Sequence, residues 1–429
     1  MRECDAREVA RRGVAALVQA AGVRVAHEAH QMLGNLYGRR ICVLVGPGLN
    51  GADGRAAAST LRARGSHVDV VSVDHQPRNF RGFDLVIDAA FGLGCSRPYL
   101  APDVASGTLV LAVDLPSGVD ADTGAVLGRP LQANVTLALG ALKYAHFDGV
   151  AAAYCGEVRF ASIGIDAPLD NALIEDSDLD TYVAMQHDDH KWTHAISVLA
   201  GSSRMPGAAA LVCAGALSAG ASMVRLESKG EIAAVVTLPV EVVRARGPEV
   251  DPRSRCVVAG PGLGNKAGSW LRERLDDTSL ATVFDADALR MDLVTMRRHA
   301  PRVLTPHRGE FERMSASTLG SNRITAVREL AQSTHCIVLL KGPTTIIADP
   351  EGHVRVVTSG TPTLASAGTG DVLSGMIGAA IARGHHPLEA ASLSAHLHGR
   401  ASARLGTFET ASSLAGAVRE ELKSRMRIL

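Results

Sequence analysis

Two series of short apolar runs, separated by segments of helical periodicity, constrain the fold of this chain most strongly. Runs that are apolar on both faces and alternate with helices are typical of parallel sheets whose two faces are covered. The spacing also predicts helices over 1–35, 54–64 and 207–221, and one that begins at Gly370. We therefore predict an α/β protein with two three-layer α/β/α domains. The predicted strands are 41–45, 68–73, 84–89, 109–115, 135–139 and 158–165 in the first domain, and 195–200, 256–259, 281–284, 303–305 and 336–341 in the second, followed by a hairpin of 345–348 and 354–357.

Residues 169–189 lie between the two series and differ from both in composition. Acidic side chains are frequent there and no apolar period is visible, which is typical of a linker. We therefore expect domains at 1–168 and 190–429, joined by an acidic linker. The tract His187-Asp-Asp-His190 has the residue types of a metal site, but an exposed polar loop is the preferred interpretation.

Composition excludes several classes of function. The 429 residues carry a formal net charge of +0 without a basic stripe, which disfavours nucleic acid as a partner. The sequence contains no run of about 18 apolar residues, so we expect no membrane span. The charged N-terminus lacks the apolar segment of a secretion signal, and the 7 cysteines form no Cys-x-x-Cys pair, so we expect a cytoplasmic protein with reduced thiols. The sequence does not determine the oligomeric state, and a homo-oligomer is compatible with it.

A glycine-rich turn follows the first predicted strand and reads Gly46-Pro-Gly-Leu-Asn-Gly-Ala-Asp-Gly54. Glycines let backbone N–H groups approach a phosphate closely, although the spacing is not that of the Rossmann fingerprint. Two further acids, Asp88 and Asp114, end predicted strands, and Pro116-Ser-Gly118 follows the second of them. Ligands of open parallel sheets bind at the carboxyl ends of strands, so these groups are expected to converge. Helix caps and plain turns are the alternative.

These motifs resemble the NAD(P)HX epimerase family, whose domain is Rossmann-like. The family's Asn-Asn-Gly-Gly-Asp-Gly turn corresponds to residues 49–54, with Leu49 and Ala52 as departures, and further matches are Val113–Gly118 and Gly140-Ala-Leu-Lys143. The resemblance implies that Asp114 and Lys143 serve epimerisation. It implies a potassium ion held by Asn50, Asp88 and Ser117. It also implies a substrate site bordered by Leu49, Asn50, Gly51, Ala52, Asp53, Gly92, Leu93, Gly94, Cys95, Ser96, Arg97 and Pro98.

The second half contains Gly368-Thr-Gly-Asp371 at the predicted start of a helix. Free N–H groups and the positive end of the helix dipole would converge there on an anion. Asp371, on the first turn, would then lie beside that anion as a base. Together these groups suit phosphoryl transfer to a hydroxyl. A glycine-rich helix start without a ligand is the alternative.

This motif and five others in order resemble the ADP-dependent NAD(P)HX dehydratase, a ribokinase-like family. The others begin at Gly201, Gly260, Phe284, Leu304 and Lys341. The resemblance implies that Asp371 is the catalytic base and that Ala208, Gly264 and His307 border the hydrate. It also implies nucleotide contacts from Lys341, Gly342, Pro343, Thr344, Thr345, Gly368, Thr369 and Gly370. The family's usual glycine before Gly368 is replaced by Ala367.

The two resemblances together imply a bifunctional repair enzyme. It would interconvert the epimers of NADHX and NADPHX and dehydrate one of them with ADP, Mg²⁺ and K⁺. The alternative is a small-alcohol kinase of the same superfamily with a non-catalytic, nucleotide-binding N-terminal module. The histidines at 385, 386, 396 and 398 are interpreted as surface or helix-face residues.

Overall fold

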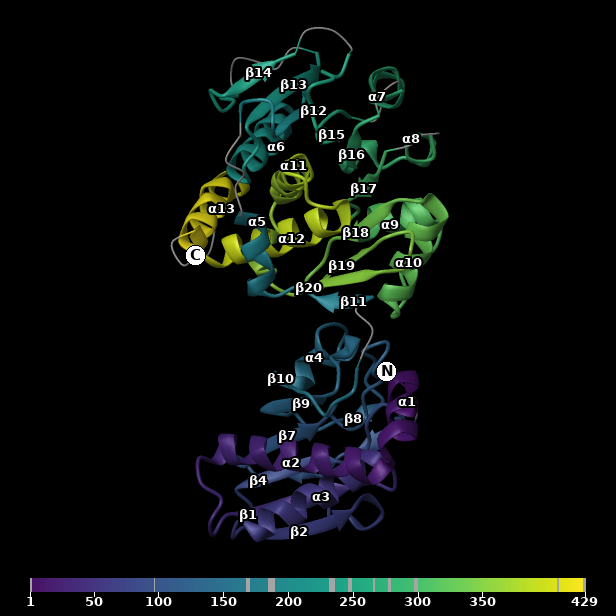
Figure 1. Cartoon of the computed structure of the whole chain (residues 1–429), viewed down its shortest axis with the longest axis vertical. Helices are drawn as coiled ribbons and strands as arrows, with labels where there is room; N and C mark the ends of the chain where they lie inside the picture. The colour runs from purple at the N-terminus through teal and green to yellow at the C-terminus, as the bar shows by residue number, and fades with distance from the viewer. Residues whose placement is uncertain are drawn as a thin grey trace. The chain divides into compact units, whose positions relative to one another are not determined.

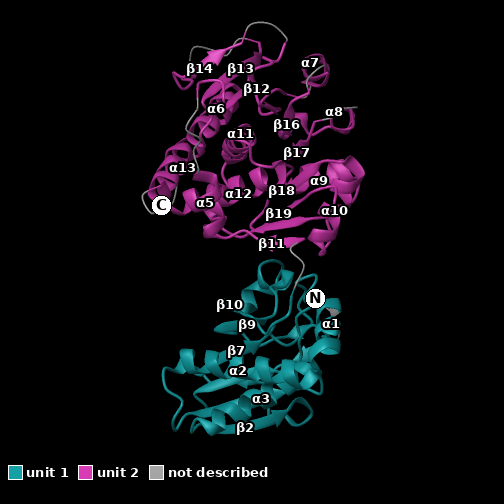
Figure 2. Cartoon of the chain, in the orientation of Figure 1, with its two compact units in different colours: residues 1–169 teal, residues 170–429 magenta. Residues whose placement is uncertain are grey.

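A computed structural model of the chain contains two compact units, residues 1–169 and 170–429 (Figure 2). The structure describes residues 2–95, 97–166, 170–183, 190–230, 236–245, 249–264, 267–276, 279–296, 300–406 and 409–426. Among these residues, no helix combines the length and the apolar character needed to cross a membrane. The predicted α/β class with parallel sheets is confirmed in both units.

The sheet of unit 1 has six parallel strands in the order β10-β9-β7-β4-β1-β2 (Figure 1). All six correspond to predicted apolar runs. The central strands β1, β4, β7 and β9 are buried along almost their whole length, so they show no polar alternation. Two short strand pairs, β3 with β6 and β5 with β8, lie outside this sheet. The strands are β1 (Arg40–Val45), β2 (His67–Ser72), β3 (Asn79–Phe80), β4 (Leu85–Ala89), β5 (Tyr99–Leu100), β6 (Asp103–Val104), β7 (Leu109–Val113), β8 (Gly128–Arg129), β9 (Val135–Leu139) and β10 (Glu157–Ala161).

Long helices cover one face of this sheet. The predicted 1–35 helix is divided into α1 (Arg2–Arg12) and α2 (Val14–Leu33), and α3 (Leu49–Ala63) follows the glycine-rich turn. Alanines of α2 and α3 pack with the strands in one apolar cluster. The opposite face packs against β3, β5 and loop residues rather than against a long helix. The short helix α4 (Ala152–Cys155) precedes β10.

The sheet of unit 2 has ten strands in the order β11-β20-β19-β18-β17-β16-β15-β12-β13-β14. Only β19 runs antiparallel to its neighbours, and the predicted hairpin of β19 and β20 is confirmed. Strands β11, β13 and β14 were not predicted. The strands are β11 (Asn171–Leu173), β12 (Ala195–Ser202), β13 (Met223–Lys229), β14 (Val242–Arg244), β15 (Cys256–Ala259), β16 (Ala281–Phe284), β17 (Arg302–Leu304), β18 (Ile337–Leu340), β19 (Thr345–Ala348) and β20 (Val354–Val357).

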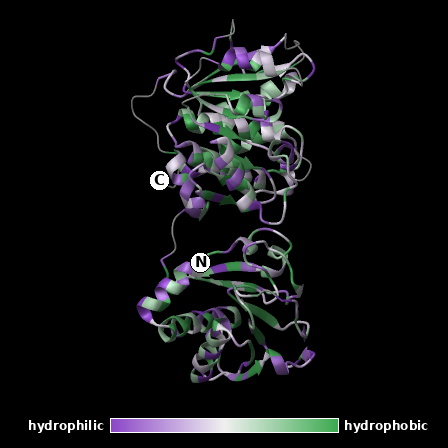
Figure 3. Cartoon of the chain, turned by 90° about the vertical axis from the view of Figure 1, so that its right-hand side faces the viewer, coloured by the Kyte–Doolittle hydropathy of each residue, from purple (hydrophilic) through white to green (hydrophobic). Residues whose placement is uncertain are grey.

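Small residues let the central helices of unit 2 pack with their backbones close together. A Cβ added at Gly215 would lie 2.2 Å from the carbonyl oxygen of Val372, and one at Gly375 would lie 2.1 Å from that of Val212. Helices α6 and α11 therefore contact through glycine. Figure 3 shows that the strands of the chain are largely hydrophobic. The helices are α5 (Asp180–Val183), α6 (Pro206–Ser218), α7 (Ala267–Leu275), α8 (Met291–Val294), α9 (Arg308–Ser315), α10 (Arg323–Thr334), α11 (Thr369–Ala382), α12 (Pro387–Ala403) and α13 (Ala411–Met426).

The prediction of an acidic linker at 169–189 is wrong for residues 170–183. They form β11, the 3-10 helix η3 (Asp176–Leu179) and α5, and β11 pairs in parallel with β20. Leu179 and Tyr182 are 0% and 1% exposed in the core of unit 2. The segment is therefore an integral part of the second domain, which begins near residue 170. Residues 184–189, with most of the His187–His190 tract, lie outside the described part of the chain.

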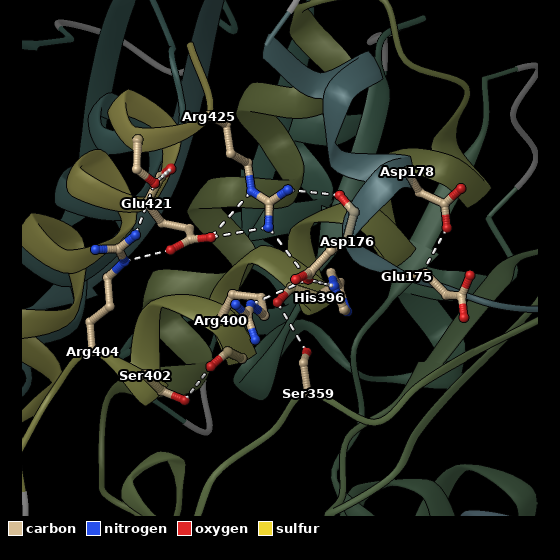
Figure 4. A network of polar contacts seen from close by, with 12 residues as sticks. Glu175, Asp176, Asp178, Ser359, His396, Arg400, Ser402, Arg404, Glu421 and Arg425 are labelled. Atoms are coloured by element: carbon tan, nitrogen blue, oxygen red, sulfur yellow. Dashed lines mark hydrogen bonds and ion pairs between the residues drawn. The ribbon is translucent and has the colours of Figure 1, made fainter. Parts of the chain in front are cut away.

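One acid of this segment, Asp176, is the centre of a network of ion pairs within unit 2. Asp176 Oδ1 lies 2.9 Å from His396 Nε2, 3.2 Å from Arg400 Nε and 3.4 Å from Arg425 Nη2 (Figure 4). Glu421 extends the network through Arg425 at 3.1 Å. Although burial favours its neutral form, the hydrogen bond from His396 and the two arginines lower the pKa of Asp176. The network therefore fastens η3 to α12 and α13.

Three of the four predicted surface or helix-face histidines have structural contacts. His396 and His398 lie on α12, as expected for helix-face residues, but both are buried and neither is on the surface. His385 stacks on Tyr182 with ring centroids 5.3 Å apart. His386 is the N-cap residue of α12.

Candidate active sites

Glycine is required at two positions of the glycine-rich turn of unit 1, because backbone carbonyl groups lie too close for a Cβ. A Cβ at Gly46 would lie 1.9 Å from the carbonyl oxygen of Ala90, and one at Gly51 would lie 2.0 Å from that of Gly46. Helix α3 begins at Leu49 rather than at the predicted Gly54. Residues 49–53 therefore form its first turns, and the methyl group of Ala52 fits an ordinary helical position.

A cavity of about 710 Å³ adjoins this helix start at the carboxyl ends of the strands. Among the predicted residues of unit 1, Gly51, Ala52, Asp88 and Ser117 do not line the cavity, and Ser96 lies outside the described residues. The predicted residues that do line it are Leu49, Asn50, Asp53, Gly92, Leu93, Gly94, Cys95, Arg97, Pro98, Asp114 and Lys143.

The cavity also has lining residues that the sequence did not predict. Helices α1 and α2 contribute Asp5 and an apolar wall that includes Leu17. Asp74 comes from a 3-10 turn after β2, and Tyr99 comes from the short strand β5. No motif identified these residues. The only available signal was the position of Asp74 directly after the predicted strand 68–73.

Asp114 and Lys143 form a buried ion pair in this cavity. Lys143 Nζ donates to Asp114 Oδ1 and to the carbonyl oxygen of Leu139, the latter at 2.9 Å. The backbone N–H of Leu139 donates to the same carboxylate oxygen at 3.1 Å. Asp114 adopts a φ of +67°, a left-handed conformation that is strained for a residue with a Cβ. The fold therefore holds this carboxylate in one position.

His146 supports the strained backbone of Asp114. Its Nε2 lies 2.7 Å from the carbonyl oxygen of Asp114, and its Nδ1 accepts from the backbone N–H of Lys143 at 3.0 Å. The acceptor role of Nδ1 places the ring proton on Nε2, which then donates. Burial lowers the pKa of His146 to about 4, so the ring is neutral at physiological pH.

Two further carboxyl groups face the same cavity. Burial, together with the negative charges of Asp114 and Asp5, raises the pKa of Asp53 to about 7. Burial also raises the pKa of Asp5, against the opposing effect of Lys143. A carboxyl group that titrates near neutral pH can both accept and donate a proton.

Asp88 and Ser117 meet beneath the cavity. The fully buried Asp88 accepts hydrogen bonds from Ser117 Oγ at 2.6 Å and from the backbone N–H of Ser117 at 2.9 Å. These bonds lower the pKa of Asp88, but the larger effect of burial raises it. Among the described residues, no cationic side chain pairs with this carboxylate. The amide nitrogen of Asn50 is buried without a hydrogen-bond partner in the same described set.

In unit 2 the start of α11 has the geometry expected of an anion site. Gly368 is the N-cap residue with a φ of +92°, and a Cβ there would lie 2.4 Å from Leu211. The Thr369 hydroxyl donates to the carbonyl oxygen of Leu364 at 2.8 Å, so it fixes the turn. His398 Nε2 lies 3.0 Å from the carbonyl oxygen of Thr369. Ala367 does not adopt a positive φ, so alanine is tolerated there.

Asp371 lies in a cluster of acids around one lysine. Burial, together with the charges of Asp285, Asp287 and Glu310, raises its pKa to about 7 against the opposing effect of Lys341. Asp285 follows β16, Glu310 lies on α9 and Lys341 follows β18. The carboxyl ends of these strands therefore converge on the start of α11.

Lys341 is held by carboxylates rather than projecting into solvent. Its Nζ lies 2.9 Å from Asp285 Oδ1 and 3.9 Å from Glu310 Oε2, and a Cβ added at Gly370 would lie 3.4 Å from it. Burial lowers the pKa of Lys341, but Asp285, Glu310 and Asp371 together raise it above its usual value. Its ammonium therefore stays charged close to the start of α11.

We expect Lys341→Met to destabilise unit 2 as well as to weaken nucleotide binding. The substitution leaves the buried Asp285 without its partner, which costs on the order of 3 kcal/mol. Urea unfolding and calorimetry with ADP would measure the two effects. The double variant Lys341→Met with Asp285→Asn is the control, and it should regain stability without regaining ADP affinity. An unchanged ADP affinity in Lys341→Met would contradict this placement.

The remaining predicted residues of unit 2 are distributed around this cluster. Gly264 donates its N–H to Asp287 Oδ2 at 2.7 Å, and His307 caps α9 by accepting the N–H of Gly309 at 3.1 Å. The turn 342–345 joins β18 to β19, with Gly342 and Pro343 exposed, Thr345 half-buried and the Thr344 side chain buried. A Cβ at Gly262 would lie 2.7 Å from the Cβ of Ala208, so those two segments adjoin.

Each unit thus has acids at the carboxyl edge of a parallel sheet, and unit 2 adds a helix N-terminus beside a carboxylate. These features define a two-domain α/β enzyme with a ribokinase-like second domain. A ribokinase-like protein of Enterococcus faecalis shares that fold, with a TM-score of 0.50 at 18% identity, over 60% of this chain and 98% of that protein. An ADP/ATP-dependent NAD(P)H-hydrate dehydratase of Bacillus subtilis, co-crystallised with ATP and Mg²⁺, matches 57% of this chain and 97% of its own with a TM-score of 0.52 and 27% identity.

Sequence comparison identifies the family. Residues 196–423 match the NAD(P)H-hydrate dehydratase model, and 14–81 and 73–145 match the YjeF-related N-terminal model. A bifunctional NAD(P)H-hydrate repair enzyme of Mycobacterium leprae is 39% identical over 86% of this chain and 84% of its own. One from Synechocystis is 31% identical over 86% and 82%. The chain belongs to the family of bifunctional NAD(P)H-hydrate repair enzymes.

Proposed function

We propose that unit 1 interconverts the R and S hydrates of NADH and NADPH and that unit 2 dehydrates the S form, using ADP. The observation that carries the proposal is a separate acid-based site in each unit of a chain that belongs to this family. The Asp114–Lys143 pair lies in one unit and the Asp371 cluster in the other. The kinase alternative is not favoured, because it assigns no chemistry to the ordered site of unit 1.

In unit 2 the reaction begins with phosphoryl transfer to the hydroxyl of the hydrate. Asp371 accepts the hydroxyl proton, and the N–H groups at the start of α11 bind the oxygens of the transferred group. Phosphate then leaves as the ring nitrogen donates its electron pair, which gives an iminium ion. Loss of a proton from the neighbouring ring carbon restores the dihydronicotinamide. Mg²⁺ would neutralise charge on the nucleotide oxygens. The described residues offer no cage of three or more His, Cys, Asp or Glu, which suits an ion held chiefly by phosphate oxygens.

In unit 1 the hydrated carbon adjoins the ring nitrogen, so loss of the hydroxyl as water leaves a stabilised iminium ion. Water then adds to the opposite face. Asp114, held by Lys143, would bind the reacting centre and move a proton, and Asp53 is a second carboxyl group within the same cavity. The cavity walls would retain the iminium ion until water returns.

A potassium ion would fit beside Asp88. A buried carboxylate that has only neutral donors favours a nearby cation. Asn50, whose amide nitrogen is buried without a hydrogen-bond partner among the described residues, would offer its amide oxygen, a ligand type that suits a hard cation. Asn50 lies next to Gly92, where an added Cβ would be 3.4 Å from Asn50 Cγ. The ion would orient the turn that follows β4 against the start of α3.

We also infer a reducing compartment such as the cytoplasm. All seven cysteines are free, and all but Cys95 are buried. Small-molecule hydrates and ADP are the proposed partners.

The rate of dehydration is expected to rise with pH and to level off above about pH 7. Asp371 acts as a base only when ionised, and its pKa is raised to about 7, so protonation removes activity as the pH falls through that value. A pH–rate profile of kcat at saturating ADP would show this limb. A flat profile between pH 5.5 and 8, to be measured in buffers of equal ionic strength (~0.1 M), would contradict the assignment.

The proposed function is tested with the purified full chain and a mixture of both hydrate epimers. With ADP and Mg²⁺, the reduced-nicotinamide absorbance should return completely. Without nucleotide, the epimers should interconvert but no absorbance should return. Replacing ADP with ATP in a parallel reaction would show which nucleotide is used. Absence of recovery with either nucleotide would contradict the proposal.

A further inference from the structure

An acidic residue follows strand β2 at the edge of the sheet that carries the glycine-rich turn. Strands β1 and β2 are parallel neighbours, and Val45 is level with Ser72. The turn that begins at Gly46 and the 3-10 helix η1 (Val73–His75) therefore leave adjacent strands on the same side. Asp74 lies in η1, and it lines the same cavity as Gly48.

The turn that carries Asp74 is fastened to its surroundings. The backbone N–H of Asp74 donates to Ser72 Oγ at 3.4 Å. Gln76 Nε2 donates to the carbonyl oxygen of Leu100 at 3.0 Å, and Gln76 Oε1 accepts from Tyr99 Oη at 2.9 Å. Tyr99 also lines the cavity. The side chain of Asp74 is exposed, so its carboxylate is accessible while its backbone is fixed.

A glycine-rich turn after one strand and an acid after the next strand occur together in parallel sheets that bind dinucleotides. The diphosphate lies at the glycine-rich turn after the first strand, and a carboxylate after the next strand accepts hydrogen bonds from the ribose hydroxyl groups. A phosphate on the 2′-hydroxyl would bring up to two negative charges against that carboxylate and remove the donor. Such a site selects the ligand without the 2′-phosphate.

The other charges of the cavity favour the same ligand. Its described lining holds four acids, Asp5, Asp53, Asp74 and Asp114, but only two basic residues, Arg97 and Lys143. Lys143 is paired with Asp114, which leaves Arg97 for the diphosphate that both ligands carry. The described lining offers no further lysine or arginine for a 2′-phosphate.

We propose that Asp74 is a specificity-determining residue of unit 1, which accepts a hydrogen bond from the 2′-hydroxyl of the adenosine ribose and selects NADHX over NADPHX. The inference rests on the proposed epimerase function of this unit. It adds the identity of the preferred hydrate and the residue that sets the preference.

The test measures epimerisation by the full chain without ADP or Mg²⁺, so that dehydration does not proceed. Purified S epimers of NADHX and of NADPHX are converted separately, and chromatography follows the R epimers. We expect the parent chain to favour NADHX in kcat/KM. We expect Asp74→Ala to lower the NADHX/NADPHX ratio by about 10-fold or more, the size of one hydrogen bond to a charged group. The change should appear in KM for both hydrates rather than in kcat.

Asp122→Ala is the matched control, because Asp122 is an exposed aspartate of unit 1 that does not line the cavity. Its ratio should equal that of the parent. An equal preference for both hydrates in the parent, or an unchanged ratio in Asp74→Ala, would overturn the role of Asp74 while leaving the epimerase function intact. A parent chain that epimerises neither hydrate would overturn the proposed function and this inference together.

Discussion

Asp371→Asn is expected to lower the rate of hydrate dehydration by about 10² to 10⁴, the usual contribution of a positioned general base. Asparagine keeps the shape of the side chain but cannot accept the hydroxyl proton. Nucleotide binding should change little, because the N–H groups of α11 remain. Single-turnover kinetics and calorimetry with ADP would measure the two properties separately.

The same variant should be at least as stable as the parent at neutral pH. The pKa of Asp371 is raised to about 7 in the folded chain, against an ordinary value of 3.8. The folded state therefore binds the proton more tightly, and its stability falls as the pH rises from about 4 to about 7. An uncharged asparagine removes that loss. Asp292→Asn, at the first turn of the surface helix α8, is the control and should keep full activity. Retention of more than half of the dehydratase activity by Asp371→Asn would show that another group is the base.

Asp114→Asn is expected to lower epimerisation by at least about 10²-fold, because it removes a carboxylate that the fold holds in one position. In the full chain with ADP and Mg²⁺, dehydration should then stall with the R hydrate left over. Chromatography of the residual hydrate at early times would show this, before spontaneous epimerisation contributes. Asp103→Asn, an exposed acid of unit 1 paired with Arg129, is the control and should consume both epimers.

Consumption of both epimers at the parental rate by Asp114→Asn would indicate that unit 1 is a binding module. Because Lys143 loses its partner in this variant, folding must be checked by circular dichroism. The companion variant Lys143→Met with Asp114→Asn removes both buried charges. It should fold like the parent and show the same stall.

The sequence predicted the sheets well because their central strands are continuous apolar runs. A short apolar run between two helices, such as Ile41–Val45, is readily recognised as a buried strand. The start of α3 was placed five residues late, because glycines at 51 and 54 lower helix propensity, and the packing against β4 overrides that preference. Strand β11 was not predicted, because a strand of three residues is too short to show an apolar period and acidic residues flank it.

Some residues of the candidate sites were predicted from the sequence, whereas others were not. The motifs contain Asp114, Lys143 and Asp371, which the structure places at strand and helix ends beside other charged groups. The partners of Lys341 could not be predicted, since Asp285 and Glu310 are separated from it by about 30 residues or more and meet it only through the sheet order. Asp5 and Asp74 reach the cavity from segments without any motif.

The pairing of β11 with β20 has a consequence for how the chain folds during synthesis. It joins residues 171–173 to 354–356, a closure of roughly 180 residues. Unit 1 contains all of its own strands, so it can complete its sheet before the ribosome has made most of unit 2. Strand β11 emerges early, however, and must wait for β20, its one neighbour in the sheet that the described residues form. During that interval its edge is exposed to other nascent chains, and the acids around it help to keep them apart.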